Sequence, residues 1–206
     1  MSKKIYLFSL VLLALAFVSC SETEEEGKFA NWRARNEAFL DSLQQVYDAK
    51  TDPELEFFVP FTDPGMKIFY KRTVKNDEGR RPVIPNVVSA YYRGSYYTGE
   101  VFDQNFTGKD PGDFDSPTEF WVNPISMSNP PHIIPVDGWI ETLQRMRTGE
   151  RWTVYLPWDM GYGTSDRDGM PGYSVLVFDI KLESVVSDYE IVENKYVYEL
   201  ITSKVW

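Results

Sequence analysis

The sequence is poor in the side chains on which most catalytic sites depend. It has one cysteine, Cys20, and one histidine, His132, in 206 residues. Zinc sites need several cysteine or histidine ligands, and a Ser-His-Asp triad needs a histidine that its partners orient. A single cysteine also cannot form a disulfide within the chain. We therefore expect no metal and no other cofactor, and a chemistry that requires neither.

The glycine-rich phosphate-binding motifs are also missing. Neither G-x-x-x-x-G-K-S/T nor G-x-G-x-x-G occurs in the chain. The segment "DRDGM" at 166–170 resembles the opening of a calcium-binding loop. The distal glutamate is not at the required spacing, so a solvated turn is the better interpretation.

Long apolar runs are restricted to the N-terminus. Lys3 and Lys4 precede a nearly apolar stretch, residues 5–18, which is short for a membrane span and typical of a signal-peptide core. With Ser19 and Cys20 behind it, residues 1–19 look like a bacterial lipoprotein signal, and Cys20 is the predicted lipidated residue. Phe17 departs from the leucine usual at that position. The alternative is a secreted protein cut near Ser19 that keeps a free thiol.

The segment "SETEEEGK" at 21–28 is strongly acidic and has little to bury. Such segments stay extended, so residues 20–30 are predicted to be a tether from the lipidated cysteine. Acidic runs in this place also resemble a surface-export tag of some Gram-negative lipoproteins. The expected location is the cell envelope, on the periplasmic or the surface side of the outer membrane, with the lipid on Cys20 as the membrane partner.

Charge excludes one further class of partner. The formal net charge is −10 at pH 7, and it becomes −12 without Lys3 and Lys4. Such a surface repels phosphate backbones, so nucleic acid is not an expected partner. Hydrophobic residues at 43% and aromatic residues at 16% support a packed core.

Residues 31–65 are predicted to be an N-terminal helix and a linker. Between residues 31 and 50, Trp32, Phe39, Leu43 and Val46 fall on one helical stripe, and the "TDPE" at 51–54 ends it. This helix would dock on the following domain or pair with a copy of itself. Residues 54–65 are expected to be a linker or an irregular packing segment.

The sequence pattern of residues 66–186 is typical of several strands and one short helix. Strands are expected at 66–74, 87–97, 118–122, 151–158 and 173–186, with a hairpin turn at Thr98-Gly99 and a helix at 139–147. A glycine inside the second strand, Gly94, suggests a bulge or a close approach. This pattern predicts an α+β domain in which an antiparallel sheet covers a single helix. The tail, residues 187–206, is open between strand, helix and partner-binding segment.

Four segments occur in the order and near the spacing of one family. They are "YYRGSYYTGEVFD", "GWIETLQRMRTGERWTVYLP", "MGYG" and "LVFDIKL". Over roughly residues 66–184 the chain resembles the FKBP-type peptidyl-prolyl isomerases. The resemblance implies an antiparallel half-barrel wrapped around one short helix, with a hydrophobic bowl between them.

The resemblance also implies the site residues. Trp139, which in isolation would be ordinary core, takes the place of the bowl's floor. Tyr92, Phe102 and Phe178 take the places of its walls, Asp103 is the polar residue beside a wall, and Tyr162 is the phenol at the rim. These six are the candidate catalytic residues. Candidate substrate-binding residues are Val136 through its backbone, the rim residue Met170, and Phe120.

Some positions depart from the family pattern. Thr118 stands where the family usually has an aromatic residue, which would open one wall. The segment 104–119 is enlarged, and no arginine partner of Asp103 is identifiable. Trp152 and Tyr155 are expected outside the bowl, against the N-terminal helix or a neighbouring strand.

The predicted function is that of a peptidyl-prolyl isomerase that assists the folding of exported polypeptides at the cell envelope. Its expected partners are proline-containing polypeptides. The alternative is a non-catalytic FKBP-like chaperone or binding module, which the altered wall and the large loop favour. A surface glycan-binding lipoprotein is a third class, suggested only by the tryptophan and tyrosine content.

Overall fold

The computed structural model describes residues 27–122, 133–192 and 195–200, with side chains as far as residue 186. The predicted leader, Cys20, His132 and residues 201–206 lie outside the described residues. The chain divides into two compact units, residues 1–32 and residues 33–206. In the first unit the Phe29 and Trp32 rings pack edge to face, with centroids 5.0 Å apart.

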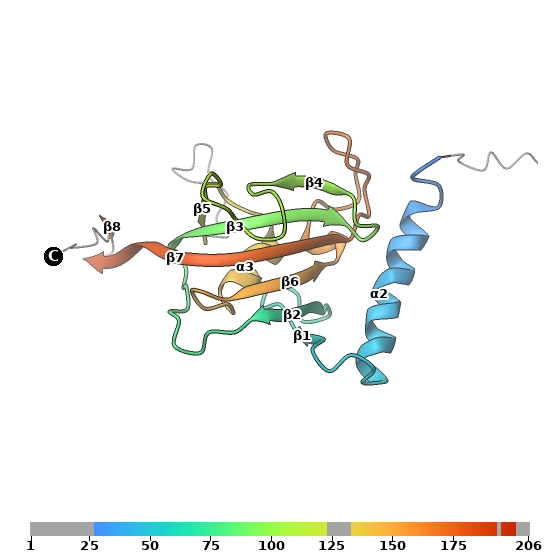
Figure 1. Cartoon of the computed structure of the whole chain (residues 1–206), viewed down its shortest axis with the longest axis horizontal. Coiled ribbons are helices and arrows are strands. Elements are labelled where there is room, and N and C mark those ends of the chain that lie inside the picture. Colours follow the sequence, from blue (N-terminus) through green and yellow to red (C-terminus); the bar gives the residue numbers. More distant parts are fainter. Residues whose placement is uncertain (1–26, 123–132, 193–194, 201–206) are drawn as a thin grey trace, which may run out of the picture. The chain divides into compact units, whose positions relative to one another are not determined.

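Among the described residues, strands are more common than helices (Figure 1). Helix α2 (Trp32–Asp48) is followed by β1 (Glu56–Phe58), β2 (Ile68–Val74), β3 (Val87–Tyr96), β4 (Val101–Gln104) and β5 (Thr118–Trp121). Next come helix α3 (Asp137–Leu143), β6 (Arg151–Leu156), the short 3-10 turn η1 (Trp158–Met160), β7 (Leu176–Val192) and β8 (Lys195–Leu200).

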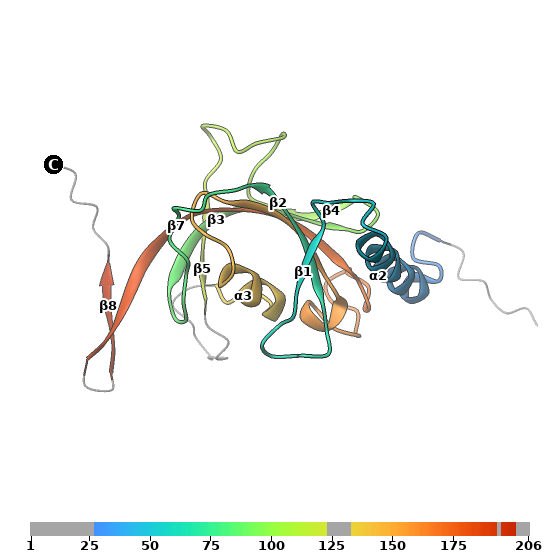
Figure 2. The same cartoon turned by 90° about the horizontal axis from the view of Figure 1, so that it is seen from below.

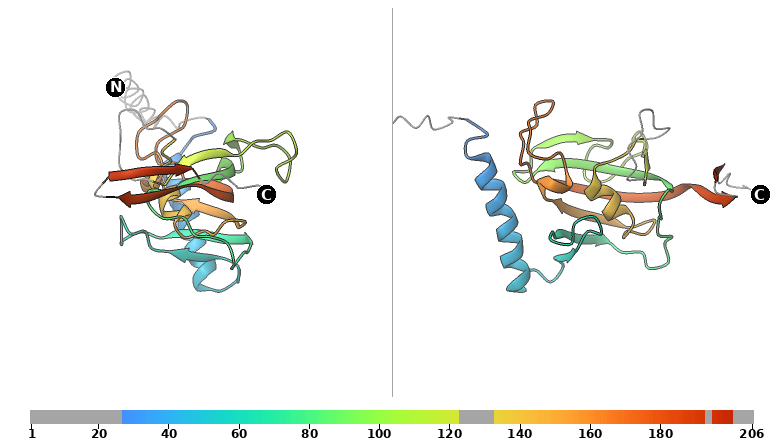
Figure 3. Two further views of the ribbon diagram at one scale, coloured as in Figure 1. Left: turned by 90° about the vertical axis from the view of Figure 1, so that its left-hand side faces the viewer. Right: turned by 180° about the vertical axis from the view of Figure 1, so that it is seen from behind.

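The strands form one antiparallel sheet. Its order is β1-β2-β6-β7-β3-β4, and β5 pairs with β3 while β8 pairs with β7. The long strands β3 and β7 pair along the whole of β3, from Val87↔Ser187 to Tyr96↔Leu176. The sheet arches around α3, which lies on its concave face (Figures 2 and 3). The predicted α+β half-barrel around one short helix is confirmed.

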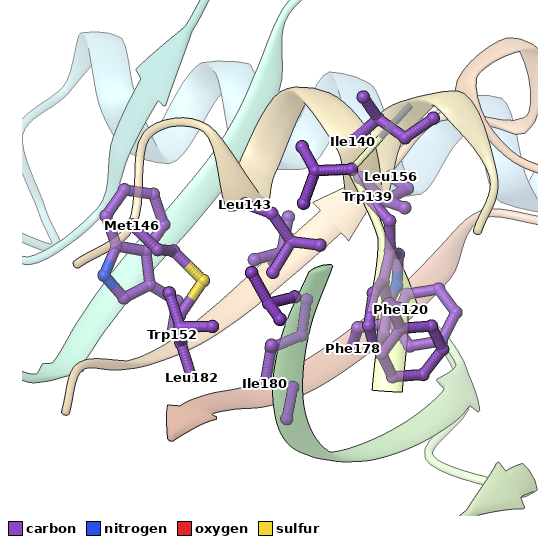
Figure 4. Close-up of a cluster of buried hydrophobic side chains, with 14 of the residues drawn as sticks. Phe120, Trp139, Ile140, Leu143, Met146, Trp152, Leu156, Phe178, Ile180 and Leu182 are labelled. Atoms are coloured by element: carbon purple, nitrogen blue, oxygen red, sulfur yellow. The ribbon is translucent and has the colours of Figure 1, made fainter. Parts of the chain in front are cut away.

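The core lies between α3 and the concave face of the sheet. Alternation along β6 decides which side chains enter it, because Trp152, Val154 and Leu156 are buried while the residues between them are only half-buried. Figure 4 shows Phe120, Trp139 and Phe178 at one end of this cluster, and Met146 and Trp152 at the other. One continuous apolar cluster therefore joins the helix to five strands.

Helix α3 begins earlier and ends sooner than the predicted 139–147. It starts at Asp137 because Val136 is extended, with ψ 156°, and acts as the N-cap residue. It ends at Leu143, after which Met146 is still fully buried and Gly149 turns the chain with φ +82°. The glycine before Trp139 is needed, since a Cβ on Gly138 would lie 2.8 Å from the carbonyl oxygen of Met160.

The segment 54–65, expected to be irregular, contains a strand. Glu56–Phe58 pairs with β2 through Glu56↔Tyr70, Phe57↔Phe69 and Phe58↔Ile68. Three residues are too few to show an alternating pattern, so the sequence offered no signal for it. The tail, which was left open, continues β7 to Val192 and returns as β8.

The outer, convex face of the sheet carries α2. Leu43 packs with Leu55 of the connecting segment and with Phe69 of β2, and Phe39 lies 6.1 Å from Tyr155 of β6 between ring centroids. The docking interpretation is therefore confirmed for this helix. Tyr155 lies outside the bowl against α2, and Trp152 stacks on Tyr70 of the neighbouring strand at 4.3 Å, as expected.

Gly94 meets both expectations for a glycine inside a strand. The pairing of β3 with β4 shifts register between Gly94 and Ser95. A Cβ on Gly94 would also lie 2.6 Å from Phe102 Cζ and 2.7 Å from Phe178 Cε1. The missing side chain thus makes room for two rings of the candidate site.

A buried carboxylate fastens the turn between α3 and β6. Glu150 is 1% exposed and accepts hydrogen bonds from the Arg147 backbone N–H at 2.8 Å, Trp152 Nε1 at 3.1 Å and Arg72 Nε at 3.0 Å. Arg72 also forms an ion pair with it. All the acceptors of this carboxylate are used internally, which makes its burial tolerable.

A second buried carboxylate holds α3 to the chain that precedes β2. Glu141 is 3% exposed and accepts the backbone N–H groups of Phe61 and Thr62, both at 3.1 Å, and Arg145 Nη1 at 2.7 Å. Burial acts to raise the pKa of Glu141, but these donors outweigh it and hold the pKa below its ordinary value.

We expect the Glu141→Gln substitution to remove part of the acid sensitivity of folding. Because the folded pKa is lowered, the ionised Glu141 stabilises the fold above its unfolded pKa of about 4.3, and this contribution is lost as pH falls through the folded pKa. Urea unfolding should therefore show a difference between wild type and variant that is largest near neutral pH and shrinks in acid. Glu78→Gln, an exposed position, is the control. Parallel pH profiles for wild type and Glu141→Gln would contradict the assignment.

Candidate active site

A hollow of about 240 Å³ opens beside the start of α3. Its lining comes from strands β3, β4, β5 and β7, from the start of α3, and from two connecting segments. The lining residues are Tyr92, Asp103, Phe120, Ile133, Ile134, Pro135, Val136, Trp139, Tyr162 and Phe178. Seven of the nine residues predicted for the site lie together here, although they come from positions as distant as 92 and 178 in the sequence.

Trp139 is both core and pocket lining. It is 2% exposed. Its indole ring meets Tyr92 at 5.4 Å and Phe178 at 5.2 Å between centroids, both edge to face at 86° and 88°. Phe120 lies 4.8 Å away with its ring tilted by 53°. These edge-to-face contacts are favourable for aromatic rings, and all four rings line the hollow.

One polar atom of the floor has no partner. Among the described residues, Nε1 of Trp139 is buried and makes no hydrogen bond. Buried donors are nearly always satisfied in native proteins, so an unpaired one beside a hollow is a feature that the fold alone does not explain.

The polar wall is a phenol paired with a carboxylate. The Tyr92 hydroxyl donates to Oδ2 of Asp103 at 2.7 Å. Asn105 fixes the backbone here, accepting the Tyr92 N–H at 2.8 Å while its own N–H donates to the Tyr92 carbonyl at 3.1 Å. Burial, and then the hydrogen bond to Asp103, raise the pKa of Tyr92 well above its ordinary value. Within the described part of the chain, no arginine forms an ion pair with Asp103.

Tyr162 stands on a thin loop between Gly161 and Gly163. Gly163 has φ +82°, a conformation that favours glycine, and its N–H donates to the Trp158 carbonyl at 2.9 Å. Tyr162 is half-buried, and burial raises the pKa of its phenol. It lines the first hollow and also a second one beside it.

The second hollow, of about 260 Å³, contains the two remaining predicted residues. It is lined by Tyr96, Phe102, Asp103, Tyr162, Arg167, Asp168, Gly169 and Met170. Phe102 therefore stands at the boundary, with its ring 5.7 Å from Phe178 and edge to face with it. The segment 166–170 is a tight turn, in which Arg167 and Met170 exchange backbone hydrogen bonds of 2.9 and 2.8 Å. It is exposed as far as Gly169, as the solvated-turn interpretation predicted.

Sequence reasoning missed part of the lining. Ile133 and Ile134 were not considered, although an apolar pair directly before Pro135 and the helix start was a usable signal. Tyr96 and Arg167 had no distinguishing signal, because their neighbours in space are distant in sequence. Thr118 lines neither hollow and accepts a hydrogen bond from Asn105 Nδ2 at 3.0 Å, so the contribution of β5 to the site is Phe120.

Comparison with known proteins places this geometry in a family. Residues 78–183, just over half of the chain, match the family described as FKBP-type peptidyl-prolyl cis-trans isomerase. The chain belongs to the FKBP-type peptidyl-prolyl cis-trans isomerase family. The predicted family and its enzyme class, an isomerase, are thereby confirmed at the level of the family.

Two named relatives match different shares of the chain. A macrophage infectivity potentiator of Trypanosoma cruzi is 28% identical over 181 residues, which are 87% of this chain and 78% of that protein. The FKBP-type 22 kDa peptidyl-prolyl cis-trans isomerase of Escherichia coli is 28% identical over 61% of this chain. The match spans only 52% of the Escherichia coli protein, about half of its length.

Two solved structures share the fold. FkpA from Escherichia coli aligns with a TM-score of 0.55 and 21% identity, over 90% of this chain and 73% of that one. A peptidyl-prolyl cis-trans isomerase from Pseudomonas syringae aligns with a TM-score of 0.51 and 24% identity, over 73% and 95%. At this level of identity the likeness establishes the architecture.

We expect the Tyr92 phenol to stay protonated well into the alkaline range. Its hydroxyl is half-buried and bonded to a carboxylate, so ionisation would place two negative charges side by side. Spectroscopic titration of tyrosinate should show no difference between folded wild type and Tyr92→Phe up to about pH 10. In urea, where Tyr92 is solvated, the same pair should differ by one tyrosine titrating near pH 10. A one-tyrosine difference near pH 10 in the folded proteins would contradict this.

Proposed function

We propose that the chain is a peptidyl-prolyl cis-trans isomerase that acts on proline-containing polypeptides exported to the cell envelope. The observation that carries the proposal is the aromatic hollow over Trp139, closed on one side by the Asp103–Tyr92 pair and bordered by Tyr162. The family match supports the reaction class.

Such a hollow suits the reaction because prolyl isomerisation needs no nucleophile. Rotation about the amide loses resonance and has a barrier of about 18–20 kcal/mol. The two X-Pro isomers are close in energy but exchange slowly, over tens of seconds or more. A catalyst has only to bind the twisted amide better than either planar form. The twisted amide is less dipolar, so it loses less when it enters a dry aromatic site.

Each side of the hollow then has a role. The substrate proline ring rests on Trp139, between walls formed by Tyr92, Phe120 and Phe178. The Phe102 ring packs against Phe178 and borders the adjoining hollow. Asp103 and the Tyr162 hydroxyl hold the polar groups of the peptide.

The residues at the edge of the hollow complete the assignment. Val136 offers a backbone N–H that, among the described residues, donates no hydrogen bond. Met170 supplies an apolar edge in the adjoining hollow.

The decisive assay is catalysis of cis-trans exchange in a proline-containing tetrapeptide. Asp103→Asn keeps the shape but removes the charge that accepts the Tyr92 hydroxyl. Loss of one charge-assisted hydrogen bond, about 1.5–3 kcal/mol, should lower kcat/KM by about 10- to 100-fold. Trp139→Leu removes the indole floor while leaving an apolar side chain, and should lower kcat/KM at least as much.

The control is chemically matched. Asp113→Asn makes the same change on an exposed loop and should leave kcat/KM unaltered. A folded wild type that does not accelerate exchange would refute the isomerase proposal, and unimpaired Asp103→Asn and Trp139→Leu variants would refute the site.

A non-catalytic chaperone module is the second candidate. It is favoured by the enlarged segment between β4 and β5, which presents Phe114 fully to solvent at 103% exposure. A solvent-exposed apolar ring can bind unfolded chains. In that case a permanently unfolded protein would bind to a wild type that shows no isomerisation, and Phe114→Ser would weaken the binding.

We propose further that Cys20 carries a lipid that attaches the chain to the outer membrane through an acidic tether. The support is the sequence of residues 1–28, a basic start, an apolar core, a cysteine and an acidic segment. Within the described residues, no helix is both long enough and apolar enough to cross a membrane.

Expression of Cys20→Ser in a Gram-negative host tests the anchor. Wild type should incorporate labelled fatty acid and sediment with membranes until detergent is added, whereas Cys20→Ser should do neither. Ser21→Ala, which keeps the thiol, should behave as wild type. Fatty-acid labelling of Cys20→Ser would show that the lipid is attached elsewhere, and an unlabelled wild type would contradict lipidation.

A further inference from the structure

The loop that presents Tyr162, residues 157–175, is closed by its own backbone. The N–H of Gly163 donates to the Trp158 carbonyl, and the N–H of Tyr173 donates to the Gly163 carbonyl, both at 2.9 Å. The two arms touch so closely that a Cβ on Gly172 would lie 2.1 Å from the Thr164 oxygen. Tyr162 therefore moves only if the backbone around Trp158 and Tyr173 moves with it.

Helix α2 reaches the same loop with a buried polar side chain. Oδ1 of Asn36 accepts the backbone N–H of Val175 at 2.7 Å, and both residues are 0% exposed. Val175 is the last residue of the loop before β7 begins at Leu176. The other contacts of α2 with the sheet are largely apolar, through Phe39 and Leu43. A hydrogen bond depends on angle as well as on distance. The fully buried Asn36 therefore fixes both the direction and the position of the end of the loop.

A second contact from α2 lies beside the first. The Arg33 guanidinium is 4.4 Å from the centre of the Tyr173 ring. Tyr173 holds a left-handed backbone, φ +60°, which is costly for a residue with a side chain. Its ring packs edge to face on Trp158 at 5.0 Å. The C-terminal arm of the loop is therefore held by α2, through Asn36 and Arg33. Tyr162, on the other arm, lines both hollows.

We propose that α2 is part of the working site, and that Asn36 is a positioning residue that sets the place of the Tyr162 hydroxyl through Val175 and Tyr173. This inference rests on the proposed isomerase function. In this proposal α2 affects the rate of catalysis, although none of its residues lines either hollow.

The test is a double-mutant cycle in the full-length protein, with kcat and KM measured on the prolyl tetrapeptide. Tyr162→Phe should lower kcat/KM, and Asn36→Ala should lower it by about ten-fold, since a small misplacement of a contacting group has effects of this order. If Asn36 acts through Tyr162, adding Asn36→Ala to Tyr162→Phe should cost less than about two-fold more. Independent effects would instead multiply.

A control and a second readout separate positioning from general stability. Gln44→Ala breaks a different α2 contact, the 2.8 Å hydrogen bond that Lys67 Nζ donates, and should leave kcat/KM unchanged. Amide hydrogen exchange in residues 157–175 should be faster in Asn36→Ala and unchanged in Gln44→Ala. If Asn36→Ala does not fold, Arg33→Ala replaces it, because that side chain is 59% exposed. It should show the same non-additivity with a smaller loss.

The outcomes are distinct. Catalytic loss that disappears in the Tyr162→Phe background, together with faster exchange in the loop, supports the proposal. An Asn36→Ala enzyme as active as wild type, multiplicative losses, or unchanged exchange in 157–175 would each overturn it while leaving the isomerase function in place. A wild type without isomerase activity would refute the function, and the positioning role with it, and the exchange data would still decide whether α2 holds the loop.

Discussion

The structure depends on how one short helix covers the concave face of a large sheet. Helix α3 has seven residues, and six of them, Gly138 to Leu143, are buried. A helix of this length cannot fill the whole arch, so the remaining space must be closed by large side chains from the strands. Aromatic rings do this at one end, around Trp139, where they pack edge to face and line a hollow. Core and candidate site are thus one continuous cluster of side chains.

Because the helix is short, charge is also used to hold it. Glu141 joins α3 to the segment before β2, and Glu150 joins the following turn to Arg72 of β2. Both carboxylates are buried, and both are surrounded by donors, which is the condition under which a buried charge is tolerated. Neither faces the aromatic hollow. The ionic contacts therefore support the frame, and the hollow itself has Asp103 as its carboxylate.

Several features of the fold could be read from the chain alone. Alternation predicted strands in the places where β2, β3, β5 and β6 occur, and the apolar stripe with its "TDPE" stop predicted α2. The ordered motifs predicted the architecture, and seven of the nine residues predicted for the site line one hollow. Strand β1 was missed because three residues carry too little pattern, and α3 was displaced because its N-cap, Val136, lacks a capping side chain.

The sequence by itself determined the family, the positions of the longer strands and the aromatic character of the predicted site, since these follow from local pattern and ordered motifs. Only the tertiary structure decided that Asp103 pairs with Tyr92, that Phe102 and Met170 border a second hollow, and that Asn36 meets Val175. Asn36 and Val175 lie 139 positions apart in the chain. A buried polar contact between residues so far apart produces no periodic pattern in the sequence. It depends on where two elements meet in space rather than on the residues next to either one.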